Sequence, residues 1–119
     1  MEITEQKIGE VTVLKLSGRL DSVSAPELKD RVKTCADNGL LHLVIDMADV
    51  SFVDSSGLGV LVACLRSLNK LAGNMRIAAL QDRVRAVFEL IRLDHIIEVF
   101  DSADAAAGSL QSVQRKVPT

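Results

Sequence analysis

A chain of 119 residues is long enough for one domain with a single hydrophobic core. Hydrophobic residues make up 48% of it and aromatic residues only 3%, while 14 Lys and Arg against 16 Asp and Glu give a formal charge of −2. A slightly acidic domain without Trp or Tyr lacks the basic surface and the stacking platforms of nucleic-acid binders, which excludes that class of partner.

The N-terminal segment predicts a β-hairpin. Residues 3–8 alternate weakly and are mostly polar, as in a strand at the edge of a sheet. Gly9 and Glu10 fit a two-residue turn. Residues 11–17 are β-branched and almost continuously apolar, and residues 18–22 then form a predicted loop.

A first helix is expected after this loop. Ser24 and Glu27 have the spacing of a capping box around Pro26, a residue that suits the first turn of a helix. Gly39 is well placed to end the helix. The predicted core positions are Leu28, Val32, Cys35 and Ala36.

A buried strand and a long helix form the centre of the chain. Residues 41–47 show almost no alternation, which indicates a central strand covered on both faces. Asp54 is a good N-cap for the next helix, because its carboxylate can accept bonds from free backbone N–H groups of the first turn. That helix ends near Gly73. Its predicted buried face consists of Leu58, Leu61, Val62, Leu65, Leu68 and Ala72.

The rest of the chain continues to alternate strand and helix. Residues 75–79 and 96–100 predict two strands, separated by a helix that Asp82 caps and that buries Val84, Val87, Phe88 and Ile91. Ser102 is the predicted cap of a short helix that buries Ala103, Ala106, Ala107 and Leu110. Residues 111–119 have no apolar period, so we expect a disordered tail after a domain of residues 1–110.

A hairpin followed by alternating helices and strands predicts an α/β domain with a mixed, mostly parallel sheet. About four to five strands and about four helices are expected. Because aromatic residues are scarce, Leu, Ile, Val and Ala must build the core, with Phe52, Phe88 and Phe100 as its only large rings.

Cysteine usage and hydropathy predict a cytoplasmic protein. Cys35 and Cys64 stand alone in predicted helices, so we expect reduced core residues and no disulfide framework. No N-terminal signal pattern is present, and no apolar run approaches the length that crosses a bilayer.

The first turn of the central helix carries two serines, Ser55 and Ser56, whose polar neighbours predict exposed hydroxyls. Gly57 and Gly59 follow, and each glycine inside a helix costs roughly 0.5–1 kcal/mol relative to alanine. The glycines either relieve crowding where the helix packs on the sheet, or let a partner's backbone approach the first turn. The helix face opposite the apolar stripe is small near the serines and basic further on, with Gly59, Ala63, Arg66 and Lys70.

The sequence gives little support for catalysis. His42 and His95 have no Cys or carboxylate at ligand spacing, so no metal site is predicted. The serines do not lie in a Gly-x-Ser-x-Gly elbow, and nothing marks either histidine as a base. Gly57-x-Gly59 lacks the third glycine of a dinucleotide-binding loop, with Val62 in its place. These features favour a protein that receives a modification, without catalytic residues or a cofactor.

The stretch from Val50 to Leu61, which contains Asp-Ser-Ser-Gly-Leu-Gly, strongly resembles the signature of bacterial anti-sigma factor antagonists. These proteins are single STAS domains. Three flanking features match as well: residues 16–21, the apolar strand ending at Asp46, and residues 75–77. The resemblance covers residues 3 to 110, nearly the whole chain.

The resemblance implies a partner-switching regulator. In this family the serine directly after the aspartate is phosphorylated, which corresponds to Ser55 here. The partner is an anti-sigma factor, a serine kinase with a histidine-kinase-like ATPase fold, which binds the unphosphorylated antagonist and releases its sigma factor. A PP2C-type phosphatase reverses the modification, and the antagonist is expected to be a monomer. The implied partner-binding residues are Asp21, Asp54, Ser55, Ser56, Gly57, Leu58, Gly59 and Ala63.

A phosphate on Ser55 adds about −1.5 to −2 charge at pH 7. The charge lands beside Asp54, and beside Asp21 if the loop of residues 18–22 packs where the family places it, so the hypothesis is a switch at the interface without refolding. Arg19 occupies a position that is often acidic in relatives and could alter partner choice. The alternative is a STAS-type interaction module in another bacterial signalling complex that does not control a sigma factor.

Overall fold

The computed structural model describes the backbone of residues 1–115 and the side chains of residues 1–111. The elements, in chain order, are β1 (Glu2–Ile8), β2 (Val11–Leu20), α1 (Ala25–Asp37), β3 (His42–Val53), α2 (Ser55–Lys70), β4 (Asn74–Ala78), α3 (Asp82–Leu90), the 3-10 helix η1 (Leu93–His95), β5 (Val99–Phe100) and α4 (Ala103–Arg115).

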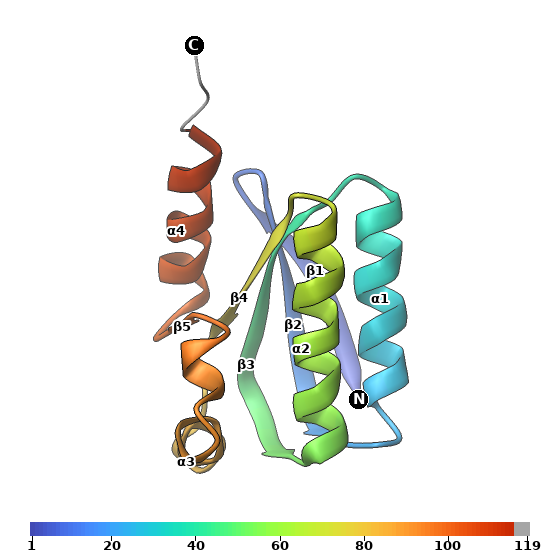
Figure 1. The fold of residues 1–119 in the computed structure, drawn as a ribbon, viewed down its shortest axis with the longest axis vertical. Coiled ribbons are helices and arrows are strands. Elements are labelled where there is room, and N and C mark those ends of the chain that lie inside the picture. Colours follow the sequence, from blue (N-terminus) through green and yellow to red (C-terminus); the bar gives the residue numbers. More distant parts are fainter. Residues whose placement is uncertain (116–119) are drawn as a thin grey trace.

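The strands form one sheet whose spatial order, β1-β2-β3-β4-β5, is also their order in the chain (Figure 1). β1 and β2 pair antiparallel, and all other neighbouring strands pair parallel. The predicted α/β class and the mixed, mostly parallel sheet are therefore confirmed. The register of β2 against β3 shifts between Lys15 and Ser17 and again between Gly18 and Arg19.

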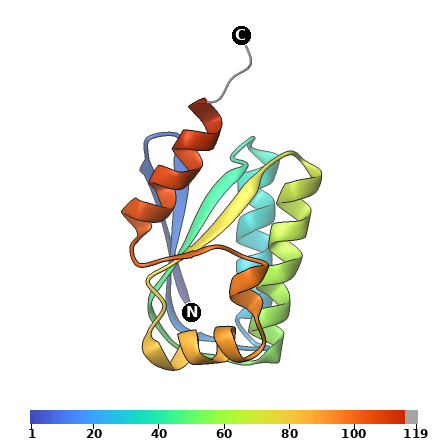
Figure 2. The same ribbon diagram turned by 60° about the vertical axis from the view of Figure 1, so that its left-hand side comes forward.

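Helices cover the two faces of the sheet unequally (Figures 1 and 2). α1 and α2 lie side by side over one face, where the larger core includes Leu14 of β2 and Ile45 of β3. α4 covers the other face, where Val13 and Val44 pack with Ala106, Ala107 and Leu110. Successive residues of a strand point to opposite faces, which is why β2 supplies Val13 to one core and Leu14 to the other.

Several predicted helix ends are confirmed. The Asp54 carboxylate accepts a hydrogen bond from the Gly57 N–H at 3.0 Å, and the Ser102 hydroxyl accepts one from the Ala105 N–H at 3.1 Å. Gly39 follows α1 with a φ of +79°, the left-handed conformation that glycine adopts without strain. These three helix ends could be predicted because an aspartate or serine at a helix start, and a glycine just after a helix end, suit those positions by their own chemistry.

Two other predicted helix starts are only partly confirmed. Ser24 is the N-cap residue of α1, as predicted, but its hydroxyl makes no capping bond and donates to the Arg19 carbonyl at 2.6 Å instead. Gln81, not Asp82, is the N-cap of α3; Asp82 is the first helical residue, and the Gln81 amide donates to the Ala48 carbonyl at 2.8 Å. In both cases the side chain bonds a backbone carbonyl outside the helix, which lies 5 residues earlier for Ser24 and 33 residues earlier for Gln81.

The extents of some elements also differ from the prediction. β5 contains only Val99–Phe100, because residues 93–95 form η1 and direct Leu93 into the core. α4 continues to Arg115, past its predicted end at Leu110, so residues 111–115 of the expected tail are helical. Residues 116–119 of that tail lie outside the described residues.

Burial follows the predicted apolar stripes with local exceptions. Phe88 is fully buried, but Phe52 is 36% exposed and belongs to the surface, contrary to the prediction. Ile91 and Ala72 are exposed as well, although both were expected in the core. The buried residues of α2 are Gly57, Val60, Leu61, Cys64, Leu65 and Leu68.

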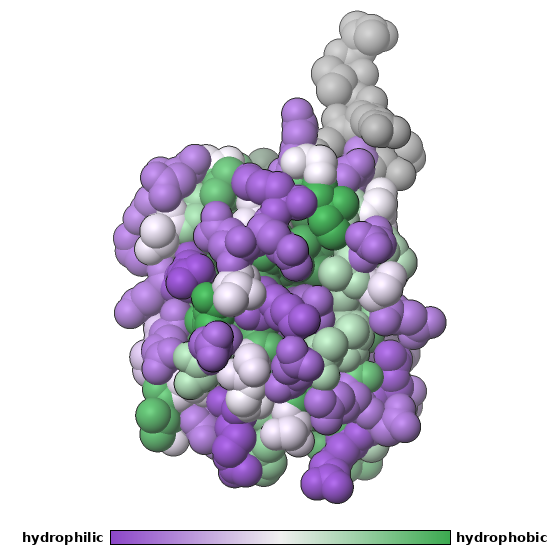
Figure 3. Space-filling model, turned by 180° about the vertical axis from the view of Figure 1, so that it is seen from behind, coloured by the Kyte–Doolittle hydropathy of each residue, from purple (hydrophilic) through white to green (hydrophobic). Residues whose placement is uncertain are grey.

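Hydrophilic side chains dominate the surface opposite to the view of Figure 1, and hydrophobic residues appear there as separate spots (Figure 3). Within residues 1–115, no helix combines the length and the apolar character that a membrane crossing requires.

Candidate functional site

The start of α2 is fixed by the end of β3. Val53 is the last strand residue and is buried, and Asp54 follows in an extended conformation, with its N–H donating to the Leu20 carbonyl at 3.2 Å. Because the Asp54 carboxylate also holds the Gly57 N–H, the turn from strand to helix is bonded on both sides. Ser55 is therefore the first residue of α2, at a rigid corner of the fold.

Ser55 and Ser56 are both exposed, as the sequence predicted. Neither hydroxyl forms a hydrogen bond with another group among the described residues. His42 begins β3 and Ser55 follows its end, so the length of a 12-residue strand, on the order of 35 Å, separates them. His95 is exposed in η1. The start of α2 thus presents two accessible hydroxyls that are not engaged in hydrogen bonds with the described residues.

The two glycines of α2 have different roles. A Cβ at Gly57 would collide with the Leu20 carbonyl oxygen and with the side chains of Leu20 and Val53, so this glycine is required by packing against the sheet. A Cβ at Gly59 would have no heavy atom within 4 Å, and the residue is exposed. The packing interpretation therefore holds for Gly57, whereas Gly59 leaves the helix surface bare.

Asp21 lies beside Asp54, because Leu20 and Val53 pair in the sheet and the two aspartates follow them. The Asp21 carboxylate accepts hydrogen bonds from the N–H groups of Ser24, at 3.2 Å, and Val23, at 3.0 Å. The pKa of Asp21 is lowered, above all by the hydrogen bond from the Ser24 N–H. The Val23 N–H, the Ser24 hydroxyl and the Arg19 charge act in the same direction, and together they outweigh desolvation, which raises the pKa. The carboxylate is therefore ionised at neutral pH, in a fixed position.

Arg19, already marked by the resemblance as a residue that could alter partner choice, forms a further part of this surface together with Phe52, which was expected in the core. The Arg19 guanidinium lies over the Phe52 ring, 4.0 Å from its centroid, and its Nε is 3.8 Å from Asp21 Oδ2. Arg19 follows the regular alternation of β2, in which Leu16 and Leu20 point to the larger core, so it points to the opposite face of the sheet, where this end of β2 is exposed. Phe52 pairs with Arg19 in the parallel register and points to the same face. The sequence marked Arg19 through its difference from relatives, but it did not show the contact with Phe52, because residues 18–20 were predicted as a loop and instead continue β2.

A model of the STAS domain matches residues 2–106 of this chain. The chain belongs to the STAS domain family.

Relatives of this STAS domain include an anti-sigma-B factor antagonist of Listeria monocytogenes, 31% identical over 99 residues that cover 83% of this chain and 86% of the relative. An anti-sigma factor antagonist from Mycobacterium paratuberculosis, known as a crystal structure, is 26% identical with a TM-score of 0.83 and covers 92% of this chain and 93% of that one. The Bacillus protein SpoIIAA in its phosphorylated form shares the fold at 22% identity and a TM-score of 0.69, covering 91% and 98% of the two chains.

The remaining residues expected to contact a partner lie along α2 of this STAS domain. Ala63 is exposed on the same helix face as Gly59, followed by Arg66 and Lys70, which are exposed as predicted. Leu58 is half-buried and packs against the larger core. The structure thus brings Asp21, Asp54, Ser55, Ser56, Gly59 and Ala63 to one accessible end and face of α2, and leaves Gly57 beneath it.

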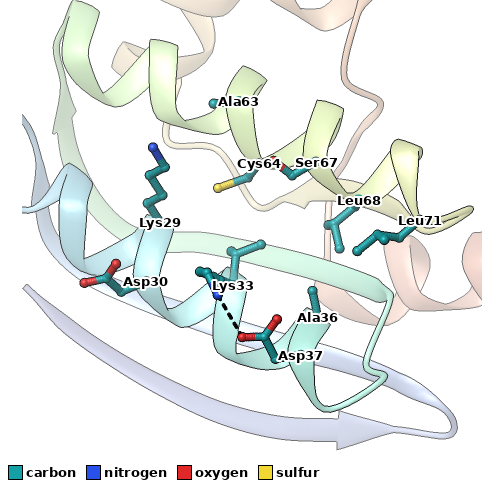
Figure 4. A pocket seen from close by; sticks show the side chains of 11 residues that line it. Lys29, Asp30, Lys33, Ala36, Asp37, Ala63, Cys64, Ser67, Leu68 and Leu71 are labelled. Atoms are coloured by element: carbon teal, nitrogen blue, oxygen red, sulfur yellow. Dashed lines mark hydrogen bonds and ion pairs between the residues drawn. The ribbon is translucent and has the colours of Figure 1, made fainter.

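A groove of about 330 Å³ separates α1 and α2 of the STAS domain (Figure 4). Lys33 at its edge pairs with Asp37 at 2.9 Å, and Lys29 and Asp30 complete its charged residues. The two positive and two negative charges cancel, so the groove has no net charge by which it would select an ionic ligand.

The described part of the STAS domain contains no cluster of three or more residues able to hold a metal ion. Cys35 and Cys64 are free and buried, in agreement with the prediction of reduced core residues. Burial raises the pKa of the Cys64 thiol to about 11, and burial is also the main cause that raises the pKa of Cys35. Both thiols are therefore protonated and poor nucleophiles at neutral pH.

Proposed function

We propose that this STAS domain is an anti-sigma factor antagonist that is switched by phosphorylation of Ser55. The observation that carries the proposal is the exposed Ser55 hydroxyl at the first position of α2, next to the fixed carboxylates of Asp21 and Asp54. The antagonist names of its relatives, and the existence of one structural neighbour in a phosphorylated form, support it.

The unphosphorylated domain binds an anti-sigma factor kinase through Asp21, Asp54, Ser55, Ser56, Leu58, Gly59 and Ala63, and the kinase then releases its sigma factor. It acts in the cytoplasm as a binding module without catalysis of its own. A PP2C-type phosphatase restores the binding form by removing the phosphate.

The site explains why a phosphate would end binding without unfolding the domain. The added charge of about −1.5 to −2 stands beside two carboxylates, so a partner surface that complements them meets repulsion or a steric block. The helix itself tolerates the modification, because a negative charge near an N-terminus interacts favourably with the helix dipole. The switch therefore acts on the contact surface and leaves the core unchanged.

Intact-mass analysis of the domain with ATP and each purified anti-sigma factor kinase of the source organism tests this proposal. One added phosphate is expected on the wild type and on Ser56→Ala, and none on Ser55→Ala. Binding of the phosphorylated form to the kinase should fall by at least tenfold. A complex without any phosphate transfer would point to an interaction module in another signalling complex, and transfer that only Ser56→Ala abolishes would move the site by one residue.

A further inference from the structure

The Arg19–Phe52 pair is continuous with the proposed partner surface. Arg19 pairs with Phe52 in the sheet, and Leu20 pairs with Val53 in the next position. Leu20 and Val53 point into the core, so the residues on either side of them point outward. Arg19 of β2 and Asp21, directly after the end of that strand, therefore share a surface with Phe52 of β3 and with Asp54, directly after the end of β3.

The pair is held in place before any partner binds. Arg19 has an exposed side chain, at 62%, yet it is restrained by the ring below it and by the Asp21 carboxylate at 3.8 Å. Phe52 is the one exposed aromatic ring among the described residues. Ordered arginines and aromatic rings are the residue types that contribute most to the centre of protein interfaces, because little side-chain entropy is lost on binding.

The guanidinium retains free donors. Its Nε faces Asp21, and its two terminal nitrogens make no hydrogen bond within the part of the chain that the structure describes. Two parallel N–H groups of an arginine match the two oxygens of a carboxylate, which gives a shorter and stronger contact than a single charge does. Among the residues proposed to contact the partner, which include two carboxylates, Arg19 would be the one cation.

We propose that Arg19, held over Phe52, is a specificity-determining contact that selects a partner with an Asp or Glu side chain at this point of its surface. The inference rests on the proposed function, in which that partner is the anti-sigma factor kinase. The alternation of charge, negative at Asp21 and Asp54 and positive at Arg19, fixes the register of the complex and disfavours partners with the reverse pattern.

Isothermal titration of the purified kinase, loaded with a non-hydrolysable ATP analogue so that Ser55 stays unmodified, tests the inference. Arg19→Gln should weaken binding about tenfold and Arg19→Glu more strongly. Arg19→Lys, which keeps the charge but loses the planar fork, should fall between Arg19→Gln and the wild type. Phe52→Leu should weaken binding because the guanidinium loses its support. Arg19→Gln, which removes the charge, should make binding less dependent on salt than Arg19→Lys does.

Arg31→Gln is the matched control, since Arg31 also forms an ion pair at 3.8 Å, with Glu5 of the edge strand β1. It should bind as the wild type does, and thermal melts should show that every variant is folded. If Arg19→Gln and Arg19→Lys both bound with wild-type affinity, the inference about Arg19 would be overturned, while the proposed function would stand. Failure of the wild type to bind or be phosphorylated by any of the kinases would instead overturn the proposed function.

Discussion

Asp54 combines two tasks in one side chain. Its carboxylate closes the first turn of α2 on the Gly57 N–H, and its charge belongs to the surface around Ser55. The capping task was readable from the sequence, because an aspartate before an apolar helical stripe has few other local roles. The corresponding role of Asp21 could not be predicted. The spacing of Ser24 and Glu27 suggested a capping box, but in the structure the Asp21 carboxylate accepts the hydrogen bonds from the backbone N–H groups of that turn.

Two substitutions of Asp54 separate its tasks. Asp54→Ala should lower the free energy of unfolding by about 1 kcal/mol, seen as a melting temperature roughly 4 °C lower, because the cap is lost. Asp54→Asn should keep nearly the wild-type stability, since its amide oxygen can still accept the Gly57 N–H, while removing the charge that the kinase would contact. Equal stability of the two variants would contradict the role of the cap.

The two glycines of helix α2 could not be told apart in the sequence, although they have different roles in the structure. Their difference depends on which residues stand across the helix from them, Leu20 and Val53 for Gly57 and open solvent for Gly59. Helical periodicity alone placed Leu58 and Ala72 on the buried face, whereas the structure buries Val60 and Cys64 there. The predicted buried face therefore lies to one side of the true buried face. The reason is that apolar residues extend around more of α2 than the sheet and α1 cover, so periodicity alone does not show which of them are buried.

Alanine substitutions should affect the stability of α2 in opposite directions. Gly57→Ala should destabilise the domain by about 1–3 kcal/mol, because its methyl group meets the Leu20 backbone, which cannot rotate away. Gly59→Ala should stabilise it by about 0.5–1 kcal/mol, since the helix gains an intrinsically better residue at an open position. Urea unfolding of both variants measures the difference. A neutral Gly57→Ala would show that the helix can move away from the sheet.

At the scale of the whole molecule, the predicted fold class, sheet type and the order of strands and helices agree with the structure, because long apolar runs and strong periodicity determine them. The misplaced parts depend on irregular geometry. Phe52 was assigned to the core because it is a large apolar ring, but it points to a part of the sheet surface that remains exposed, and a sequence does not show which parts of a sheet the helices leave uncovered. β5 was predicted too long because the apolar run of Ile96 and Ile97 also suits the turn after a 3-10 helix.

The two buried thiols report on the larger core, between the sheet and helices α1 and α2. Cys35 and Cys64 should react slowly with a thiol reagent such as Ellman's reagent in the native protein and completely in guanidinium chloride, because burial both blocks access and keeps the thiols protonated. Phosphorylation of Ser55 should leave the native rate unchanged if the switch is confined to the surface. A markedly faster rate after phosphorylation would indicate that the modification opens the α1–α2 layer.

The order of the sheet has a consequence for synthesis of the chain. Each strand after β1 is added beside the strand made just before it, so no strand waits for a partner that the ribosome has yet to produce. Because neighbouring segments meet first, the nascent domain can grow in one direction, with a single unfinished edge at any moment. The hairpin of β1 and β2 forms the starting edge, and its mostly polar β1 strand protects that side from pairing with other nascent chains.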